Sequence, residues 1–184
     1  MVINMSIVSY KDKESLEGEA LAIYDKAMAK SGRVTNMVRT LLHSVPAFQA
    51  LEFYPVRDEL LKKIGSRAVY FYCYAISSEN ECLICTTYHA KLLEEFNLKP
   101  EEFSFTEIEK VLIDYGRALV KCPNHIEQEI YDRLGELFTE EEIVLITAVG
   151  CKMIASNLFN SAMKVDLDEY LYQVKFDKNI LGKR

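Results

Sequence analysis

Two cysteines and a histidine within eight residues, Cys82, Cys85 and His89, have types and a spacing that could do chemistry. If all three lay on one α-helix, which advances about 100° per residue, their side chains would fall within an arc of roughly 60°. Residues three apart on a helix lie about 5–6 Å apart, which suits the Cα separation of a disulfide. The two thiols could therefore form a disulfide without unwinding the helix, and the imidazole could approach Cys85.

The thiolate is the nucleophilic form of cysteine, and a nearby imidazole can take the proton from a thiol of pKa ~8.5. Ser78 and Glu81 have the spacing of a capping box, which predicts a helix that begins at Ser78 and continues to residue 97. Cys82 would then end the first turn, where the helix dipole favours an anion. The dipole thus favours Cys82 and the histidine favours Cys85, so the spacing leaves open which thiol attacks.

Two other interpretations of the pair are open. Cysteines are often buried as small hydrophobic residues, and a pair at helical spacing can serve packing alone. A structural zinc ion needs four ligands, usually from two separated pairs, and Cys73, Cys122 and His125 form no second pair. We expect no metal and no other cofactor. Cys73 and Cys151 lie in apolar runs, which predicts buried and unreactive thiols.

Helical spacing of apolar residues predicts most of the secondary structure. Residues 66–76 are ambiguous, because Val, Tyr, Phe and Ile favour a strand by propensity whereas a buried helix fits equally well. Thr139 and Glu142 have the spacing of a second capping box. Short polar connections predict six to eight helices in one compact all-α domain, residues 1–184. The other expected helices cover residues 15–30, 35–45, 46–64 with a break at Pro55, 106–122, 125–138 and 139–165.

Charge and composition exclude some classes of protein. A net charge of −6 and a pI of about 5.2, without a clustered basic face, argue against a nucleic-acid binder. The amino-terminal residues lack the pattern of a secretory signal, and we expect no segment long enough to span a membrane. Five cysteines, an odd number, do not suit a structural disulfide framework. A cytoplasmic protein is expected.

The segments "LLHSVPAF" (41–48) and "SRAVYFYCYAISSENECLICTTYHAKLLEEFNLKPEE" (66–102) resemble the carboxymuconolactone decarboxylase and alkylhydroperoxidase D-like family. Residues 108–169 look like the continuation found in its peroxidase-related branch, where a second repeat lacks the cysteine pair. The resemblance implies an all-helical bundle of two repeated halves, the first at roughly 40–98 and a degenerate second at roughly 108–167. It also implies a homo-oligomer, and a buried helix at 66–76.

The resemblance also implies roles for the three motif residues. In the peroxidase branch the second cysteine of the motif attacks the hydroperoxide, so Cys85 would be peroxidatic and Cys82 resolving. His89 would belong to the proton relay. The implied partners are a small hydroperoxide as substrate and an unidentified thiol reductant protein, with no bound cofactor.

This sequence departs from the family pattern at one relay position. The family has a glutamate twelve residues before the first cysteine, and Tyr70 stands there. A phenol with pKa ~10 is a poor proton acceptor near neutrality, so weak activity is expected. Glu79, Glu81 and Glu142 are the candidates to replace the missing carboxylate.

The sequence therefore predicts a thiol-dependent peroxidase that reduces hydrogen peroxide or small organic hydroperoxides. An alternative from another class is a non-catalytic thiol/disulfide redox sensor or scaffold, in which the bridge alters helix packing. A lactone decarboxylase, the other activity in the family name, is disfavoured because a cysteine pair has no evident role in removing carbon dioxide.

Overall fold

The computed structural model describes residues 6–52, 54–98 and 104–175. Within these ranges the chain forms nine α-helices, one more than the upper end of the expected count, and no strand. The end of the quoted motif segment, residues 99–102, lies outside the described residues. The helices are α1 (Gly18–Ser31), α2 (Asn36–Leu41), α3 (Val45–Glu52), α4 (Val56–Ile64), α5 (Ser66–Glu79), α6 (Leu83–Glu94), α7 (Glu107–Lys121), α8 (Gln128–Leu137) and α9 (Glu140–Ala162).

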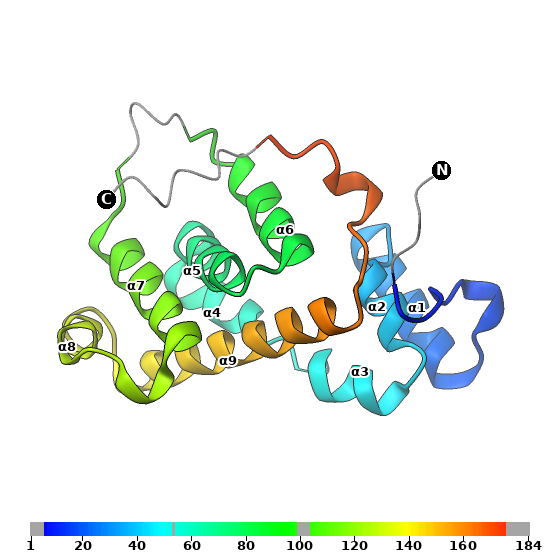
Figure 1. The fold of residues 1–184 in the computed structure, drawn as a ribbon, viewed down its shortest axis with the longest axis horizontal. Helices are drawn as coiled ribbons and strands as arrows, with labels where there is room; N and C mark the ends of the chain where they lie inside the picture. The colour runs from blue at the N-terminus through cyan, green and yellow to red at the C-terminus, as the bar shows by residue number, and fades with distance from the viewer. Residues whose placement is uncertain (1–5, 53, 99–103, 176–184) are drawn as a thin grey trace.

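Helix α5 is the centre of the bundle and resolves the ambiguity of residues 66–76 in favour of a helix. It packs against α4, α6, α7 and α9 (Figure 1). Residues on all sides of it are buried, among them Phe71, Tyr72 and Tyr74. Burial on every side explains why aromatic and β-branched residues form a helix here, since packing overrides a weak strand propensity.

Helix α9 is the longest helix and runs along one side of the molecule beneath α5 and α7 (Figure 1). The predicted capping box at its start is confirmed: the Glu142 amide donates a hydrogen bond to the Thr139 hydroxyl oxygen, and the Thr139 amide donates one to the Glu142 carboxylate. Near the end of α9, one side of the helix faces the interior, and Ser156, Asn157 and Asn160 are buried there. The helix thereby brings polar side chains from the second half of the chain to the start of α6.

The predicted capping box at Ser78 is wrong. Ser78 lies inside α5, which continues to Glu79 because its apolar face stays buried. The backbone of Glu81 then adopts a left-handed conformation with φ 54°, and the Cys82 amide donates to the Ser77 carbonyl at 3.1 Å. This is a Schellman ending, and it reverses the chain so that the next helix begins at Leu83.

One helix, α9, bears on the expectation that no segment could span a membrane. Among the described residues, α9 is the one helix long and apolar enough by length and composition, with a mean hydropathy of 1.5. Its first turn carries Glu140, Glu141 and Glu142. Length and composition are weak evidence for a membrane span, because core helices of soluble proteins meet the same criterion.

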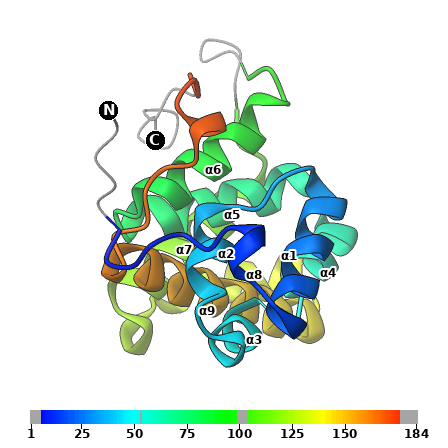
Figure 2. The same cartoon turned by 90° about the vertical axis from the view of Figure 1, so that its right-hand side faces the viewer.

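The amino-terminal segment lies beside the segment that follows α9, and the latter segment runs up to α6 (Figure 2). The Ile7 amide donates to the Met163 carbonyl at 3.0 Å, and the Tyr10 hydroxyl donates to Asp166 at 2.8 Å. Residues 163–174, which follow α9, therefore form a covering segment over the start of α6, together with Tyr10.

Candidate functional site: a cysteine pair at the start of a helix

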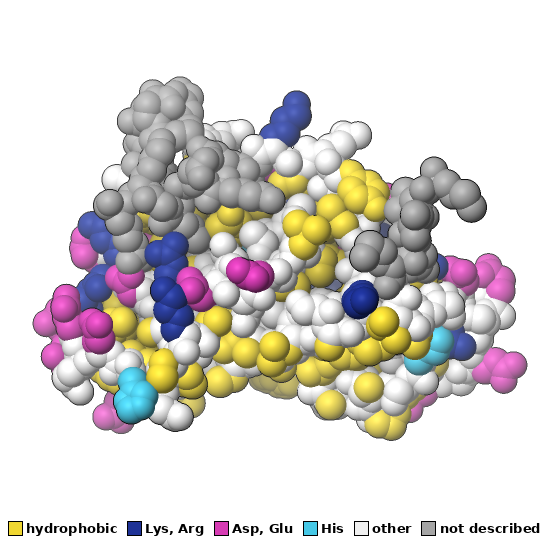
Figure 3. All heavy atoms as spheres, in the orientation of Figure 1, with side chains coloured by type: hydrophobic (Ala, Val, Ile, Leu, Met, Phe, Trp, Pro, Cys, Tyr) yellow, Lys and Arg dark blue, Asp and Glu magenta, His cyan; other side chains and the backbone are white. Residues whose placement is uncertain are grey.

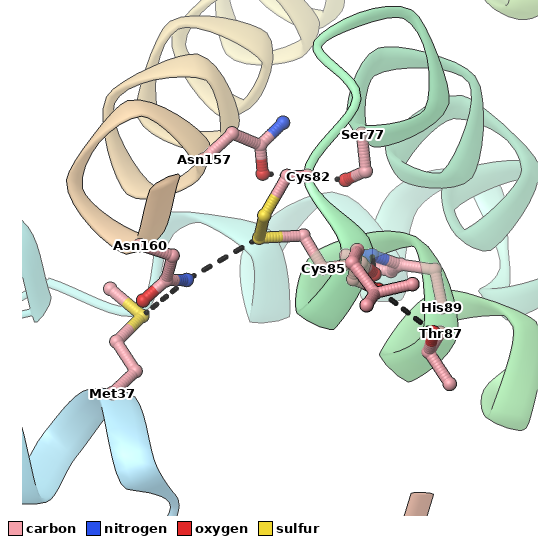
Figure 4. The surroundings of a disulfide bond; sticks show 9 residues. Met37, Ser77, Cys82, Cys85, Thr87, His89, Asn157 and Asn160 are labelled. Atoms are coloured by element: carbon pink, nitrogen blue, oxygen red, sulfur yellow. Dashed lines mark hydrogen bonds between the residues drawn. A yellow bond between two sulfur atoms is a disulfide. The ribbon is translucent and has the colours of Figure 1, made fainter. Parts of the chain in front are cut away.

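Cys82 and Cys85 form a disulfide with a Cα separation of 5.3 Å (Figure 4). The spacing predicted that both cysteines lie on one face of a helix, and this prediction is wrong. Cys82 is the N-cap of α6, with φ −80° and ψ 99°, and Cys85 is the third residue of that helix. The pair therefore lies across the amino-terminal end of α6.

This position changes the electrostatic argument. The amino-terminal turn of a helix presents unpaired backbone N–H groups and the positive end of the dipole, which favour a thiolate. Both sulfur atoms lie at that turn, since Cys82 caps α6 and Cys85 belongs to its first turn. The helix dipole therefore no longer favours Cys82 alone.

His89 is next to the cysteine pair but contacts the backbone rather than a sulfur atom. Its Nδ1 lies 2.9 Å from the Cys85 carbonyl oxygen, which can only accept, so Nδ1 carries the proton and donates. Its Nε2 is buried and has no hydrogen-bond partner among the described residues. Burial, with a contribution from Arg57, lowers the pKa of His89 to about 3. The imidazole is therefore neutral at physiological pH.

Tyr70, at the relay position, and Glu79, a candidate to replace the missing carboxylate, both have other partners. Tyr70 packs against the Phe96 ring, with centroids 6.2 Å apart, and burial raises its pKa. Glu79 forms ion pairs with Arg117 and Lys121, at 3.9 and 3.4 Å.

The remaining two carboxylates, Glu81 and Glu142, differ in their positions. Glu81 is exposed in the turn between α5 and α6. Glu142 caps α9, about 27 Å along that helix from Asn160, which contacts the cysteine pair. The structure thus brings Cys82, Cys85 and His89 together, and it does not bring Glu142 to them.

Sequence reasoning missed the residues of α9 that meet the cysteine pair. The Asn160 amide nitrogen donates to Cys85 Sγ at 3.3 Å and to Met37 Sδ at 3.4 Å, so it lies between two sulfur atoms (Figure 4). Asn157 accepts a hydrogen bond from the Ser77 hydroxyl at 3.4 Å. Two asparagines three residues apart in an apolar helix were the available signal, because buried amides need partners.

The cysteine pair is buried: Cys82 is 1% exposed and Cys85 is 7% exposed. Ile84, Val165 and Leu171 pack around it, with further cover from residues at the two ends of the described chain. A cavity of about 530 Å³ lies beside this cover, lined by residues that include Tyr10, Leu167 and Tyr170. Those side chains both line the cavity and pack on the cysteine cluster, so they separate the two.

The other three cysteines differ in burial. Cys73 is fully buried in α5, as expected, and burial raises its pKa to about 12. Cys151 was also expected to be buried, but it is exposed on α9, because only one side of that helix faces the core. Among the described residues, no three or more His, Cys, Asp or Glu side chains gather in a group that could hold a metal ion.

Solved structures resemble the whole described fold. A protein from Ralstonia eutropha, titled an alkylhydroperoxidase AhpD core and uncharacterized peroxidase-related protein, aligns with a TM-score of 0.74 and 21% identity over 91% of this chain and 95% of that chain. An uncharacterized peroxidase-related protein from Silicibacter sp. aligns with a TM-score of 0.74 and 15% identity, over 96% and 97% of the two chains.

A third structure, a putative antioxidant defence protein AhpD from Agrobacterium tumefaciens, aligns with a TM-score of 0.59 and 20% identity over 68% of this chain and 93% of that chain. No protein-family model and no curated protein matches the sequence. The shared feature is therefore the arrangement of helices, since the identities are low. The family resemblance found in the sequence is confirmed at this level: the chain has the all-helical alkylhydroperoxidase D-like fold.

Proposed function

We propose that the protein is a thiol-dependent peroxidase that reduces hydrogen peroxide or small organic hydroperoxides through Cys85 and Cys82. The observation that supports this most directly is the Cys82–Cys85 disulfide at the amino-terminal turn of α6. A helix start favours the thiolate that peroxide chemistry needs, and sulfur atoms already within bonding distance can form and break a disulfide without moving the backbone far.

The proposed cycle balances as follows. The Cys85 thiolate attacks the terminal oxygen of the hydroperoxide, the O–O bond breaks, and the alkoxide takes a proton and leaves as an alcohol. Cys85 is then a sulfenic acid. The Cys82 thiol attacks that sulfur, water leaves, and the disulfide forms. An external dithiol, from an unidentified reductant protein, returns two electrons and two protons by thiol–disulfide exchange.

The part of His89 in this cycle is limited by its hydrogen bond. Since Nδ1 donates to the Cys85 carbonyl, only Nε2 can exchange a proton with a substrate or a leaving group. With Tyr70 in place of a carboxylate, we propose slow turnover rather than rapid peroxide removal.

We also propose a cytoplasmic homo-oligomer that needs no bound cofactor. An exposed apolar face of α9 supports assembly: Val144 is 69% exposed and Leu158 is 59% exposed. Figure 3 shows hydrophobic side chains in a row over α9. Exposed apolar faces of this kind are typical of protein interfaces.

The test is peroxide consumption with a small dithiol as reductant, for the wild type, Cys85→Ser and Cys82→Ser. We expect Cys85→Ser to lose turnover. In a parallel reaction without dithiol, Cys82→Ser should consume one equivalent of peroxide and then stop, with a sulfenic acid on Cys85 that a dimedone probe captures. Cys151→Ser, a change at an exposed free cysteine, is the matched control and should turn over like the wild type. Equal rates for all four proteins would refute the proposal.

A redox sensor is the second candidate, and the burial of the pair favours it. Because residues 163–174 pack over the sulfur atoms, breaking or forming the disulfide could alter how that segment lies. A sensor would consume one equivalent of peroxide even with excess dithiol present, and its oligomer size or protease sensitivity near residue 170 would change. Sustained turnover without such a change would exclude it.

A further inference from the structure

Asn160 presents a hydrogen-bond donor to the sulfur atom proposed to attack. The side chain lies in the last turn of α9 and is 5% exposed. Its Nδ2 is 3.3 Å from Cys85 Sγ. The backbone beneath it is fixed by the end of α9, where the Asn160 carbonyl accepts from the Val165 amide at 2.9 Å. Figure 4 shows the amide directed at the sulfur from the side opposite His89.

A donor at this position acts more strongly on a thiolate than on a thiol. Neutral sulfur is a weak acceptor, whereas a hydrogen bond to an ionised acceptor is roughly twice as strong as one between neutral groups. A group that binds the charged form better shifts the equilibrium toward it. The Asn160 amide therefore favours ionisation of Cys85.

Burial makes such a donor necessary. Cys73 is buried in the middle of α5, and its pKa is raised to about 12, so it stays protonated. Cys85 is also buried, at 7% exposed. Unless hydrogen-bond donors or positive charge offset the loss of water, burial would keep Cys85 protonated too.

Among the described residues, Asn160 is the polar side chain that donates a hydrogen bond to Cys85 Sγ. His89 uses its N–H on the Cys85 carbonyl, which leaves Nε2 as an acceptor only. Asn157 lies one turn earlier on α9; its oxygen accepts from the Ser77 hydroxyl, and its amide nitrogen has no hydrogen-bond partner among the described residues, Cys85 Sγ included. The start of α6 favours ionisation at both cysteines, so it does not choose between them.

On the basis of the proposed function, we propose that Asn160 stabilises the Cys85 thiolate through its side-chain amide and thereby makes Cys85, rather than Cys82, the attacking sulfur.

The test is the pH dependence of alkylation of the reduced protein by iodoacetamide, with the labelled cysteine identified by mass spectrometry. In the wild type we expect the midpoint for Cys85 to lie below that for Cys82. Asn160→Ala should raise the Cys85 midpoint by about one pH unit, which corresponds to a loss of a charge-assisted hydrogen bond. Asn160→Asp keeps the shape but replaces the donor with a negative charge, and it should raise the midpoint further.

Two controls separate this effect from loosened packing. Asn157→Ala removes a buried amide from the same helix and should leave the Cys85 midpoint unchanged. Met37→Leu removes the other sulfur contacted by Asn160 and should do the same. Circular dichroism identifies variants that fail to fold; if Asn160→Ala fails, the comparison uses Asn160→Asp and Asn160→Ser. An unchanged Cys85 midpoint in the folded Asn160 variants, or an equal shift in Asn157→Ala, would overturn the inference.

Alkylation needs no peroxide, so this result is independent of turnover. A raised Cys85 midpoint in Asn160→Ala supports thiolate stabilisation even if the wild type consumes no hydroperoxide, in which case only the proposed function fails. Normal peroxide turnover with an unchanged Cys85 midpoint would instead support the proposed function and refute the role proposed for Asn160.

Discussion

The Tyr72 hydroxyl donates a hydrogen bond to the Ile146 carbonyl at 2.9 Å and so joins α5 to α9. These are the helices that lead to Cys82 and carry Asn160. The tyrosine fits because two glycines face it: a Cβ at Gly116 would lie 3.0 Å from the Tyr72 ring, and one at Gly150 would overlap its hydroxyl. The spacing of the two halves of the site therefore depends on this buried phenol.

Gly150→Ala should destabilise the fold, because the added methyl group collides with Tyr72 and Leu119 in a closely packed core. We expect a loss of about 1–3 kcal/mol in the free energy of unfolding, measured by urea denaturation. Gly135→Ala is the matched control, since a Cβ there meets nothing within 4 Å. That change should stabilise α8 by about 0.5–1 kcal/mol. Equal stability of Gly150→Ala and Gly135→Ala would show that the core around Tyr72 rearranges to accept the added methyl group.

An ion pair between a partly exposed arginine and a buried glutamate joins the start of α5 to the start of α7. Arg67 Nε lies 2.9 Å from a carboxylate oxygen of Glu109, whose side chain is 3% exposed and also caps α7. Arg67→Met leaves the buried Glu109 carboxylate with the Thr106 amide still donating to it, so we expect a loss of about 1.5–3 kcal/mol, the range for a hydrogen bond to a charged group. The measurement is chemical denaturation of the variant and the wild type.

Lys110→Met tests the same helix at an exposed ion pair. Lys110 Nζ lies 2.7 Å from Glu107, and both side chains are largely in solvent. Exposed pairs contribute about 0–1 kcal/mol, so this variant should unfold close to the wild type. A similar loss of unfolding free energy in Arg67→Met and Lys110→Met would mean that the burial of Glu109 does not strengthen its ion pair.

The buried histidine predicts an acid-sensitive fold. The pKa of His89 is lowered by burial from 6.5 to about 3, so between these values the unfolded chain binds a proton that the folded chain excludes. The contribution of the neutral His89 to the free energy of unfolding is complete above pH 6.5. It is lost as the pH falls toward 3, at about 1.4 kcal/mol per pH unit. His89→Gln should therefore show a shallower fall in stability between pH 6 and pH 4 than the wild type.

The measurement is urea denaturation at several pH values, which separates a change of slope from a uniform loss of stability. His43→Gln is the control, because His43 lies at an exposed position where its Nε2 contacts the Ser9 carbonyl. Its stability should fall with pH as steeply as that of the wild type. If His89→Gln keeps the wild-type slope, His89 is protonated in the folded protein.

The sequence was most informative where patterns are local. Apolar spacing and the Thr139 capping box predicted the helices, because both arise within a few turns of chain. The motif spacing predicted that Cys82 and Cys85 could bond, which they do. It could not locate the start of α6. A left-handed residue after a helix is usually glycine, and here that residue is Glu81, so the sequence does not mark the end of α5.

Contacts between distant segments could not be predicted in this way. Asn160 is 75 residues from Cys85, and nothing local to either residue indicates the bond between them. The cover over the cysteine pair likewise combines Tyr10 with the residues after α9. Such contacts follow from how the helices pack, and a periodic pattern shows only which side of a helix is buried.

The three free cysteines should differ in how fast they react. In the oxidised protein Cys122 and Cys151 are exposed, whereas Cys73 is buried with a pKa of about 12. Alkylation at pH 8 should therefore label Cys122 and Cys151 rapidly and Cys73 at least about 100-fold more slowly, since both access and ionisation are reduced. Mass spectrometry should find two labels on the native chain and three after unfolding without reductant. Rapid labelling of Cys73 in the native protein would mean that α5 opens readily, and a fourth label before reduction would mean that the Cys82–Cys85 bridge is not closed in solution.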